Sequence, residues 1–217
     1  HLAHRRQRQM CIRDSREAVE DAGVEHKTLI IFTSDNGYLC GAHGYGSKVL
    51  PYEESSRVPL IIYDPRSEKK AVRCNVATGN IDLAATILDA ALGRPNHGNG
   101  TSLLKHYVNN NNPKRDRIIP LINVWGPEQV FSLGFVKGEW KYIYWPYTGD
   151  GMKATAEMYN LKEDPLELHN RINDNATRDI RVQLEKDYAN LIHDWTQQVI
   201  DRPHYKKAAN LFTPKGM

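Results

Sequence analysis

The chain has 217 residues, of which 40% are hydrophobic and 25% are charged, and its formal net charge is +3. This composition is typical of a folded globular protein, and the length allows one full domain or a larger domain with a small subdomain. The net charge is too small to indicate nucleic-acid binding, and no apolar run approaches the roughly 18 residues of a membrane span. We therefore expect neither nucleic acid nor a membrane as a partner.

Residues 1–15 differ in character from the rest of the chain. They are basic, lack periodicity and give way to ordinary sequence at about Arg16. A basic arm for an anionic partner is one interpretation. The interpretation that we favour is a non-native or disordered leader that is not part of the folded domains. The three cysteines of the chain have no regular spacing, which favours isolated thiols over a disulfide framework.

Residues 16–112 have the pattern of an α/β domain. A helix is predicted to end at Gly23, and the continuous apolar run 28–33 is typical of a strand buried on both faces. A second buried strand is predicted at 58–63 and a possible third at 72–77. In α/β sheets ligands bind beyond the carboxyl ends of the strands, which directs attention to the residues that follow the first run.

A helix is predicted after the strands of this domain. Asn80 is placed to act as its N-cap, and Gly93 is placed to end it. The apolar residues that fall on one face of this predicted helix are Ile81, Ala84, Ala85, Leu88 and Ala91.

Residues 113–217 have a different pattern and follow a polar linker. Short strand-like runs separated by glycine turn signals predict an antiparallel meander. The runs are 118–124, 130–136, 140–145 and 158–161. A final amphipathic helix has its apolar residues spaced to cover one face of a sheet, at Leu184, Tyr188, Leu191, Ile192, Trp195 and Val199. We therefore expect a smaller α+β subdomain here, with antiparallel strands and one long helix.

Functional side chains gather directly after the first buried run. Asp35 and Asn36 offer a carboxylate and an amide oxygen, and oxygen ligands suit Ca²⁺ or Mg²⁺ better than zinc. His43 and Lys48 follow in the same loop-rich segment, and an ammonium group is suited to an anionic substrate. The order of these groups indicates hydrolysis of a charged ester, although Asp-Asn-Gly alone is more often a turn.

The segment from Thr28 to Pro65 resembles the second metal-binding half of the type I sulfatases, in the alkaline phosphatase superfamily. The matching elements are Ser34-Asp-Asn-Gly37, Gly41-Ala-His-Gly44, Lys48 and Tyr52-Glu-Glu-Ser-Ser-Arg-Val-Pro-Leu60. Weaker similarity follows to Leu104 and reappears at Trp140-Lys-Tyr-Ile and from Glu157 to Asn170. The resemblance covers most of the chain after Arg16 and implies a fold that contains part of the layered sulfatase sheet.

The resemblance also implies roles for individual residues. Asp35 and Asn36 correspond to the pair that binds calcium, or sometimes magnesium, and Lys48 to the lysine that contacts the sulfate group. Lys48 would offset negative charge during S–O cleavage. His43 is a candidate to bind substrate or to protonate a leaving oxygen, and a structural role for it is equally open. We expect Glu53, Glu54 and Arg57 to hold the loop that carries Lys48.

The sulfatase nucleophile is a formylglycine made from Cys or Ser in a Cys/Ser-x-Pro/Ala-x-Arg motif, and this motif is absent from the chain. Cys11 is followed by neither its proline nor its arginine. The resemblance therefore implies the C-terminal portion of a sulfatase, with 16–112 from the catalytic domain and 113–217 as the C-terminal subdomain. We expect this portion alone to be inactive.

The resemblance makes a sulfated carbohydrate or an aryl sulfate the expected substrate. A phosphodiesterase or phosphonate hydrolase of the same superfamily is a second interpretation, and a non-catalytic binder of sulfated glycans is a third. The aromatic run 140–147 could stack on a sugar, but alternation between core and surface is the simpler expectation. Members of the family are periplasmic, secreted or lysosomal, and neither compartment nor oligomeric state follows from this chain.

Overall fold

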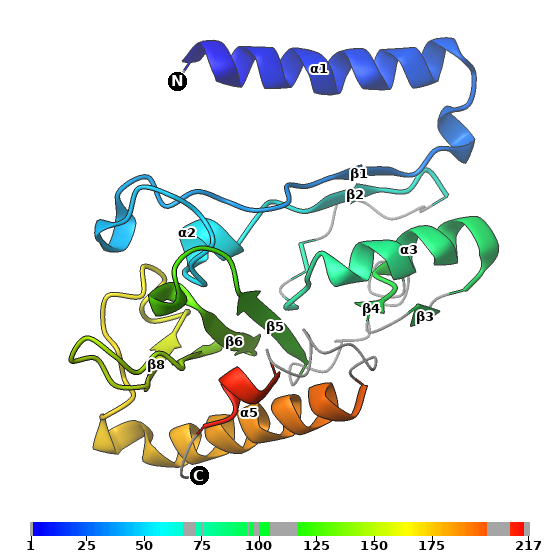
Figure 1. The fold of residues 1–217 in the computed structure, drawn as a ribbon. Helices are drawn as coiled ribbons and strands as arrows, with labels where there is room; N and C mark the ends of the chain where they lie inside the picture. Colours follow the sequence, from blue (N-terminus) through cyan, green and yellow to red (C-terminus); the bar gives the residue numbers. More distant parts are fainter. Residues whose placement is uncertain are drawn as a thin grey trace. The chain divides into compact units, whose positions relative to one another are not determined.

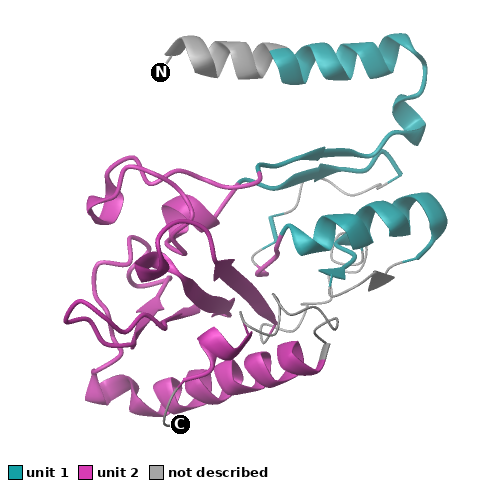
Figure 2. Cartoon of the chain, viewed as in Figure 1, with its two compact units in different colours: residues 1–34, 59–75, 80–112 teal, residues 35–58, 76–79, 113–217 magenta. Residues whose placement is uncertain are grey.

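The computed structural model of the chain divides into two compact units (Figure 2). The first comprises residues 1–34, 59–75 and 80–112, and the second comprises 35–58, 76–79 and 113–217. The residues that the structure describes are 2–66, 73–74, 76–94, 96–97, 100–104, 117–198 and 209–214. Within these ranges no helix is both long enough and apolar enough to cross a bilayer.

The first unit begins with helix α1, Leu2–Asp21 (Figure 1). The helix continues across the predicted boundary between residues 15 and 16. Val19 is half-buried, and the other residues from 11 to 21 are exposed. Gly23 follows with a φ of 65°, a left-handed conformation that glycine adopts without strain. The predicted helix end is confirmed, while the leader assignment for residues 1–15 stays a prediction.

The two predicted strands of this unit form an antiparallel pair. Strand β1, Ile30–Phe32, pairs with β2, Ile61–Tyr63, with Ile31 opposite Ile62. β1 is half-buried and both Ile61 and Tyr63 are exposed, so the expectation of strands buried on both faces is wrong for this chain. A two-stranded ribbon has too few neighbours to cover both of its faces. Two residues of the predicted strand 72–77 lie outside the described residues, and its described residues form no strand.

Helix α3, Ile81–Leu92, forms where predicted and ends at Gly93 in a left-handed conformation. The predicted face is only partly right. The buried residues of this helix are Asp82, Ala85 and Thr86. Strands β3, Asn96–His97, and β4, Gly100–Thr101, form an antiparallel pair. Asp82 and Thr86 form hydrogen bonds to β4 and to the residues that follow it. The Asp82 carboxylate accepts from Thr101 N–H at 3.0 Å, and the Thr86 hydroxyl accepts from Leu103 N–H at 3.0 Å.

The predicted N-cap of α3 is also not formed. Asn80 has helical backbone angles and makes no capping bond, whereas its side-chain amide donates to the carbonyl of Ser34 at 3.2 Å. The side chain therefore joins two segments of the first unit instead of closing the helix end.

The second unit is built on the predicted antiparallel meander. The strands run in the order β5–β6–β7–β8, and each pairs with the next (Figure 1). Their bounds are Ile118–Asn123, Ser132–Lys137, Trp140–Trp145 and Thr155–Asn160. Helix α5, Arg178–Gln198, is the predicted long helix. The mixed α/β class with an antiparallel subdomain is thereby confirmed.

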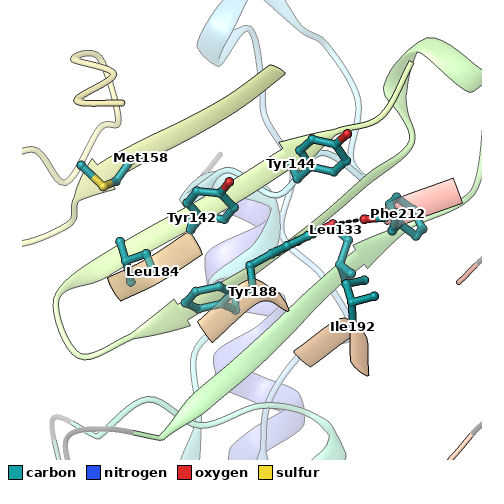
Figure 3. Close-up of a cluster of buried hydrophobic side chains, with 9 residues drawn as sticks. Leu133, Tyr142, Tyr144, Met158, Leu184, Tyr188, Ile192 and Phe212 are labelled. Atoms are coloured by element: carbon teal, nitrogen blue, oxygen red, sulfur yellow. Dashed lines mark hydrogen bonds between the residues drawn. The ribbon is translucent and has the colours of Figure 1, made fainter. Parts of the chain in front are cut away.

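One face of this sheet packs against α5 (Figure 3). Strand β7 contributes Tyr142 and Tyr144, and α5 contributes Tyr188, whose ring centroid lies 5.5 Å from each of the other two. The Tyr188 hydroxyl donates to the carbonyl of Phe212 at 2.8 Å. The remaining buried members of this core are Leu133, Phe135, Met158, Leu184, Ile192 and Phe212. Val199, the last residue of the predicted helix face, lies outside the described residues.

The other face of the sheet is covered by residues 35–58, which we call segment 35–58. Ile143 of β7 and Tyr159 of β8 pack there against Leu39, Leu50 and Tyr52. Successive residues of β7 therefore alternate between two buried faces. The expected alternation between core and surface is wrong, because the sequence far upstream supplies a second cover for the sheet.

Candidate metal and anion site

Asp35 and Asn36 lie at the start of segment 35–58 with their side chains held in place locally. The Asp35 carboxylate accepts from Asn36 N–H at 2.9 Å. The side-chain nitrogen of Asn36 donates to the carbonyl of Gly37 at 2.7 Å, which fixes which end of the amide carries the oxygen. Asp35 is exposed and Asn36 is half-buried. Neither residue is therefore packed in a dry core.

Gly37 fixes the path of the chain beyond this pair. Its N–H donates to Ser55 O and that of Tyr38 donates to Glu54 O, each at 2.8 Å. A β-carbon at residue 37 would collide with the carbonyl of Glu54. The two stretches of backbone approach so closely that only glycine fits, which places Asn36 next to the segment that follows Lys48.

Lys48 lies beside the candidate metal ligands. Its Nζ is 3.3 Å from Oδ1 of Asn36, although the two residues are twelve positions apart in the sequence. The Lys48 side chain is exposed, so its ammonium group is open to an incoming anion. The structure thus brings together three of the four predicted site residues.

The donor set fits a hard divalent cation. It consists of carboxylate and amide oxygens, and an amide oxygen carries two lone pairs, so Asn36 can serve both an ammonium group and a cation. The oxygen atoms of this pair favour Ca²⁺ or Mg²⁺ over a transition metal. Two ligand residues leave most positions around such an ion to other groups.

His43 is packed inside the second unit. Its ring stacks on Tyr52 with centroids 3.8 Å apart and an interplanar angle of 11°, and its Nε2 lies 3.7 Å from a carboxylate oxygen of Glu54. Only 12% of its side chain is exposed. These contacts favour the structural alternative for His43, and its role as a substrate ligand or acid stays a prediction.

Sequence reasoning missed Lys141, whose side chain is completely buried on β7. Its Nζ lies 2.8 Å from Glu167 Oε1 and 2.9 Å from Glu53 Oε1. The predicted arginine–carboxylate pair exists as well, with Arg57 3.4 Å from Glu53, but the Arg57 side chain is 76% exposed. A lysine within the apolar run Trp140–Trp145 was the available signal, because a charge in a covered strand requires a partner.

His43, Glu54 and Glu167 bring three potential ligand atoms within 4.8 Å of one another. A cation bound there would lie close to the Lys141 ammonium group, which already contacts Glu167. Burial raises the pKa of Glu167, and Lys141 partly offsets that effect. The ammonium group of Lys141 would repel a cation bound at this cluster, which disfavours a metal centre there.

Tyrosines line the face of the sheet that segment 35–58 covers. Burial raises the pKa of Tyr52, and the neighbouring carboxylate of Glu157 raises it further. Tyr52 donates to that carboxylate at 3.0 Å and Tyr159 donates to it at 3.2 Å. These phenols stay neutral and donate hydrogen bonds, and the bond from Tyr52 joins segment 35–58 to the sheet.

Comparison with known proteins identifies the family of the chain. The family model described as N-sulphoglucosamine sulphohydrolase, C-terminal, matches residues 41–194. The chain therefore belongs to this family of sulfatases.

Several sulfatases are similar in sequence to most of the chain. N-acetylglucosamine-6-O-sulfatase of Bacteroides thetaiotaomicron is 31% identical over 158 residues, which cover 70% of this chain and 28% of that protein. Arylsulfatase K of Danio rerio is 31% identical and covers 70% and 29%. The arylsulfatase of Chlamydomonas reinhardtii is 32% identical and covers 78% and 30%. The chain spans less than a third of the length of these relatives.

Solved structures share the fold. The structure of BT4656 in complex with its substrate D-glucosamine-2-N,6-O-disulfate has a TM-score of 0.73 at 25% identity, covering 88% of this chain and 39% of that one. The phosphonate monoester hydrolase of Agrobacterium radiobacter has a TM-score of 0.64 at 22% identity, covering 82% and 37%. The second likeness shows the fold alone and does not distinguish sulfate from phosphonate chemistry.

Proposed function

We propose that this chain is the C-terminal portion of a sulfatase that hydrolyses sulfate esters, with a sulfated carbohydrate as the substrate. The reaction consumes water and releases an alcohol and sulfate. The supporting observation is the contact of 3.3 Å between Lys48 Nζ and Asn36 Oδ1, because an ammonium group there lies beside two residues whose oxygen atoms suit a hard cation. Membership of the sulfatase family supports the reaction, and the two relatives named for glucosamine sulfates support the substrate class.

In this proposal Asp35 and Asn36 bind Ca²⁺, or Mg²⁺, and Lys48 binds the sulfate group. A bound divalent cation would neutralise negative charge on the sulfate oxygens. Lys48 orients the same group and stabilises charge that moves onto the bridging oxygen when the S–O bond breaks. The nucleophile, a formylglycine, belongs to a part of the protein outside this chain.

The role of Lys48 is tested by substitution in the complete protein. We expect Lys48→Ala to lower kcat/KM for glucosamine 6-sulfate by about 100- to 1,000-fold, the usual effect of removing one group that stabilises transition-state charge. Lys162→Ala is the matched control, because that side chain is 77% exposed and its carboxylate partner is 3.7 Å away. Equal activity of the Lys48→Ala protein and the parent would contradict the assignment.

The metal assignment is tested by chelation and by Asp35→Ala. We expect either treatment to abolish hydrolysis, and Asp35→Ala to prevent recovery when Ca²⁺ or Mg²⁺ is added back, because a hard cation depends on carboxylate ligands. Glu163→Ala, which removes an exposed carboxylate of the second unit, is the control. Retention of bound calcium by the Asp35→Ala protein, measured by elemental analysis, would refute the assignment.

Two other functions remain as outcomes of these assays. Turnover of a phosphonate monoester without turnover of any sulfate ester would assign the protein to phosphonate hydrolases. Binding of a sulfated glycan that survives both chelation and Asp35→Ala, without turnover, would indicate a non-catalytic binding protein. We also expect the isolated chain of 217 residues to show no turnover of an aryl sulfate, because a cation held by two residues binds weakly.

A further inference from the structure

Lys141 makes all of its polar contacts on the face of the sheet that segment 35–58 covers. Its Nζ lies 2.8 Å from the carbonyl of Pro51 and 3.4 Å from the hydroxyl of Ser56. The carboxylate of Glu53 at 2.9 Å and that of Glu167 at 2.8 Å complete its surroundings. Three of these four acceptors belong to residues 51–56, a stretch that begins only three residues after Lys48.

A buried ammonium group is retained only where its charge and its donors are satisfied. Lys141 meets this condition through residues 51–56 together with Glu167. The carboxylate of Glu167 also accepts from Glu53 N–H at 2.6 Å, so it binds the same short helix, α2, Glu53–Ser56. Residues 51–56 are thus attached to the sheet by an ion cluster of Lys141, Glu53 and Glu167.

The backbone between Lys48 and this cluster is strained. Val49 has a φ of 85°, which a β-branched residue adopts only when its surroundings impose it. Its N–H donates to the hydroxyl of Ser55 at 3.0 Å. Because Ser55 belongs to α2, the conformation next to Lys48 depends on the helix that the ion cluster attaches to the sheet.

We propose that Lys141 is a positioning residue, which acts through residues 51–56 and the strained Val49 to keep the Lys48 ammonium group beside Asn36. The positioning itself stands on contacts within the second unit. Its consequence for hydrolysis rests on the proposed function, and the two are tested separately.

The positioning is tested on the full chain by hydrogen–deuterium exchange. We expect Lys141→Met to raise amide exchange in residues 49–57 by at least about tenfold, since removing one partner of a buried ion pair is strongly destabilising. Peptides of β6 and α5 are expected to change much less. Lys137→Met is the matched control, because Lys137 makes a 2.6 Å ion pair with Asp187 on the α5 face. Unchanged exchange in 49–57 would overturn the proposal, as would an equal rise throughout the second unit.

A second variant tests the proposal in case the Lys141→Met chain does not fold. Glu53→Gln keeps Lys141 and Glu167 paired and weakens the link from Lys141 to α2, together with the exposed pair between Glu53 and Arg57. We expect it to raise exchange in 49–57 while the circular dichroism spectrum stays that of the parent. A folded Glu53→Gln chain with parental exchange in this segment would overturn the proposal.

The catalytic consequence is tested in the complete protein by a double-mutant cycle. We expect Lys141→Met to lower kcat/KM for the sulfate ester in the parent and to have no further effect in a Lys48→Ala background, because it acts through Lys48. Equal losses in both backgrounds would show a merely structural role and would contradict the proposal. If the parent hydrolyses no sulfate ester, the proposed function fails, and the exchange experiment still decides whether Lys141 positions the segment.

Discussion

One face of the β5–β8 sheet packs against α5 through aromatic and aliphatic side chains, whereas the opposite face receives segment 35–58 through an apolar cluster and a buried ion cluster. The apolar face gains stability from area removed from water, an interaction that does not depend on direction. Ion pairs and hydrogen bonds require defined geometry. The comparison indicates that the α5 face stabilises the second unit and that the other face fixes the register of the segment that carries the candidate site.

Alkaline pH is expected to cause the largest loss of stability in the second unit, and to act on both faces of the sheet alike. Burial raises the pKa of Tyr52 and Tyr159 on one face and of Tyr142 and Tyr188 on the other. A raised folded-state pKa gives stability that is complete below the ordinary tyrosine pKa of about 10 and is lost as the pH rises above that value. We expect phenolate absorbance from these residues to appear together with loss of ellipticity. Their ionisation with unchanged ellipticity would contradict this.

Tyr188→Ala is expected to cause a larger loss of stability than Gly37→Ala or Arg57→Ala on the opposite face. It removes a completely buried ring from the α5 face, and such truncations lower the free energy of unfolding by about 3–5 kcal/mol. Urea unfolding of the chain measures the loss. Tyr188→Phe is the control, because it deletes only the bond to Phe212 and should cost about 1 kcal/mol. A similar cost for both variants would mean that the hydroxyl, and not apolar packing, stabilises this face.

Gly37→Ala tests the opposite face at the candidate site. The added β-carbon meets the backbone carbonyl of Glu54, which cannot rotate away, so we expect a loss of about 1–3 kcal/mol in urea unfolding. The hydrolysis that we propose to depend on Lys48 should also become slower, because the backbone at residue 37 and that at Glu54 must separate. Gly46→Ala is a matched control, since no atom lies within 4 Å of the position of its β-carbon. It should change stability by at most about 0.5 kcal/mol, and an equal effect of the two substitutions would contradict the close approach at Gly37.

Arg57→Ala is expected to have the smallest effect. The Arg57 side chain is 76% exposed, and its ion pair with Glu53 is screened by solvent, so its removal should cost no more than about 0.5 kcal/mol. Urea unfolding at low and high salt checks this. If Lys141→Met, measured in the same way, costs no more than Arg57→Ala, the exposed pair of Arg57 and Glu53, rather than the buried ion cluster, holds α2.

The local elements of the second unit could be predicted from the sequence, since period-two runs and glycine turns are short-range signals. The candidate site could be predicted because Asp35, Asn36 and Lys48 stand in one motif. The cover over the second sheet face could not, because it joins residues about a hundred positions apart: Tyr52 bonds to Glu157 across 105 residues and Lys141 to Pro51 across 90. Composition and periodicity carry no information about such pairings.

The prediction for α3 was inaccurate for a related reason. An apolar stripe was expected to select the buried face, but buried Asp82 and Thr86 have hydrogen-bond partners in the β3–β4 region that local pattern does not reveal. Polar residues are acceptable in a buried face when such partners exist. Knowledge of the partner strands would have been needed to place these two side chains.

The sequence separation within the ion cluster has a consequence for biosynthesis. Chains emerge from the ribosome at about 5–20 residues per second, so Lys48 is made several seconds before Lys141 and Glu167. Until β7 and the turn that carries Glu167 have emerged, α2 lacks its attachment to the sheet, and only contacts within segment 35–58 support the strained backbone at Val49. A premature stop codon between Lys48 and Glu167 would therefore remove this attachment although every residue of the candidate site had been translated.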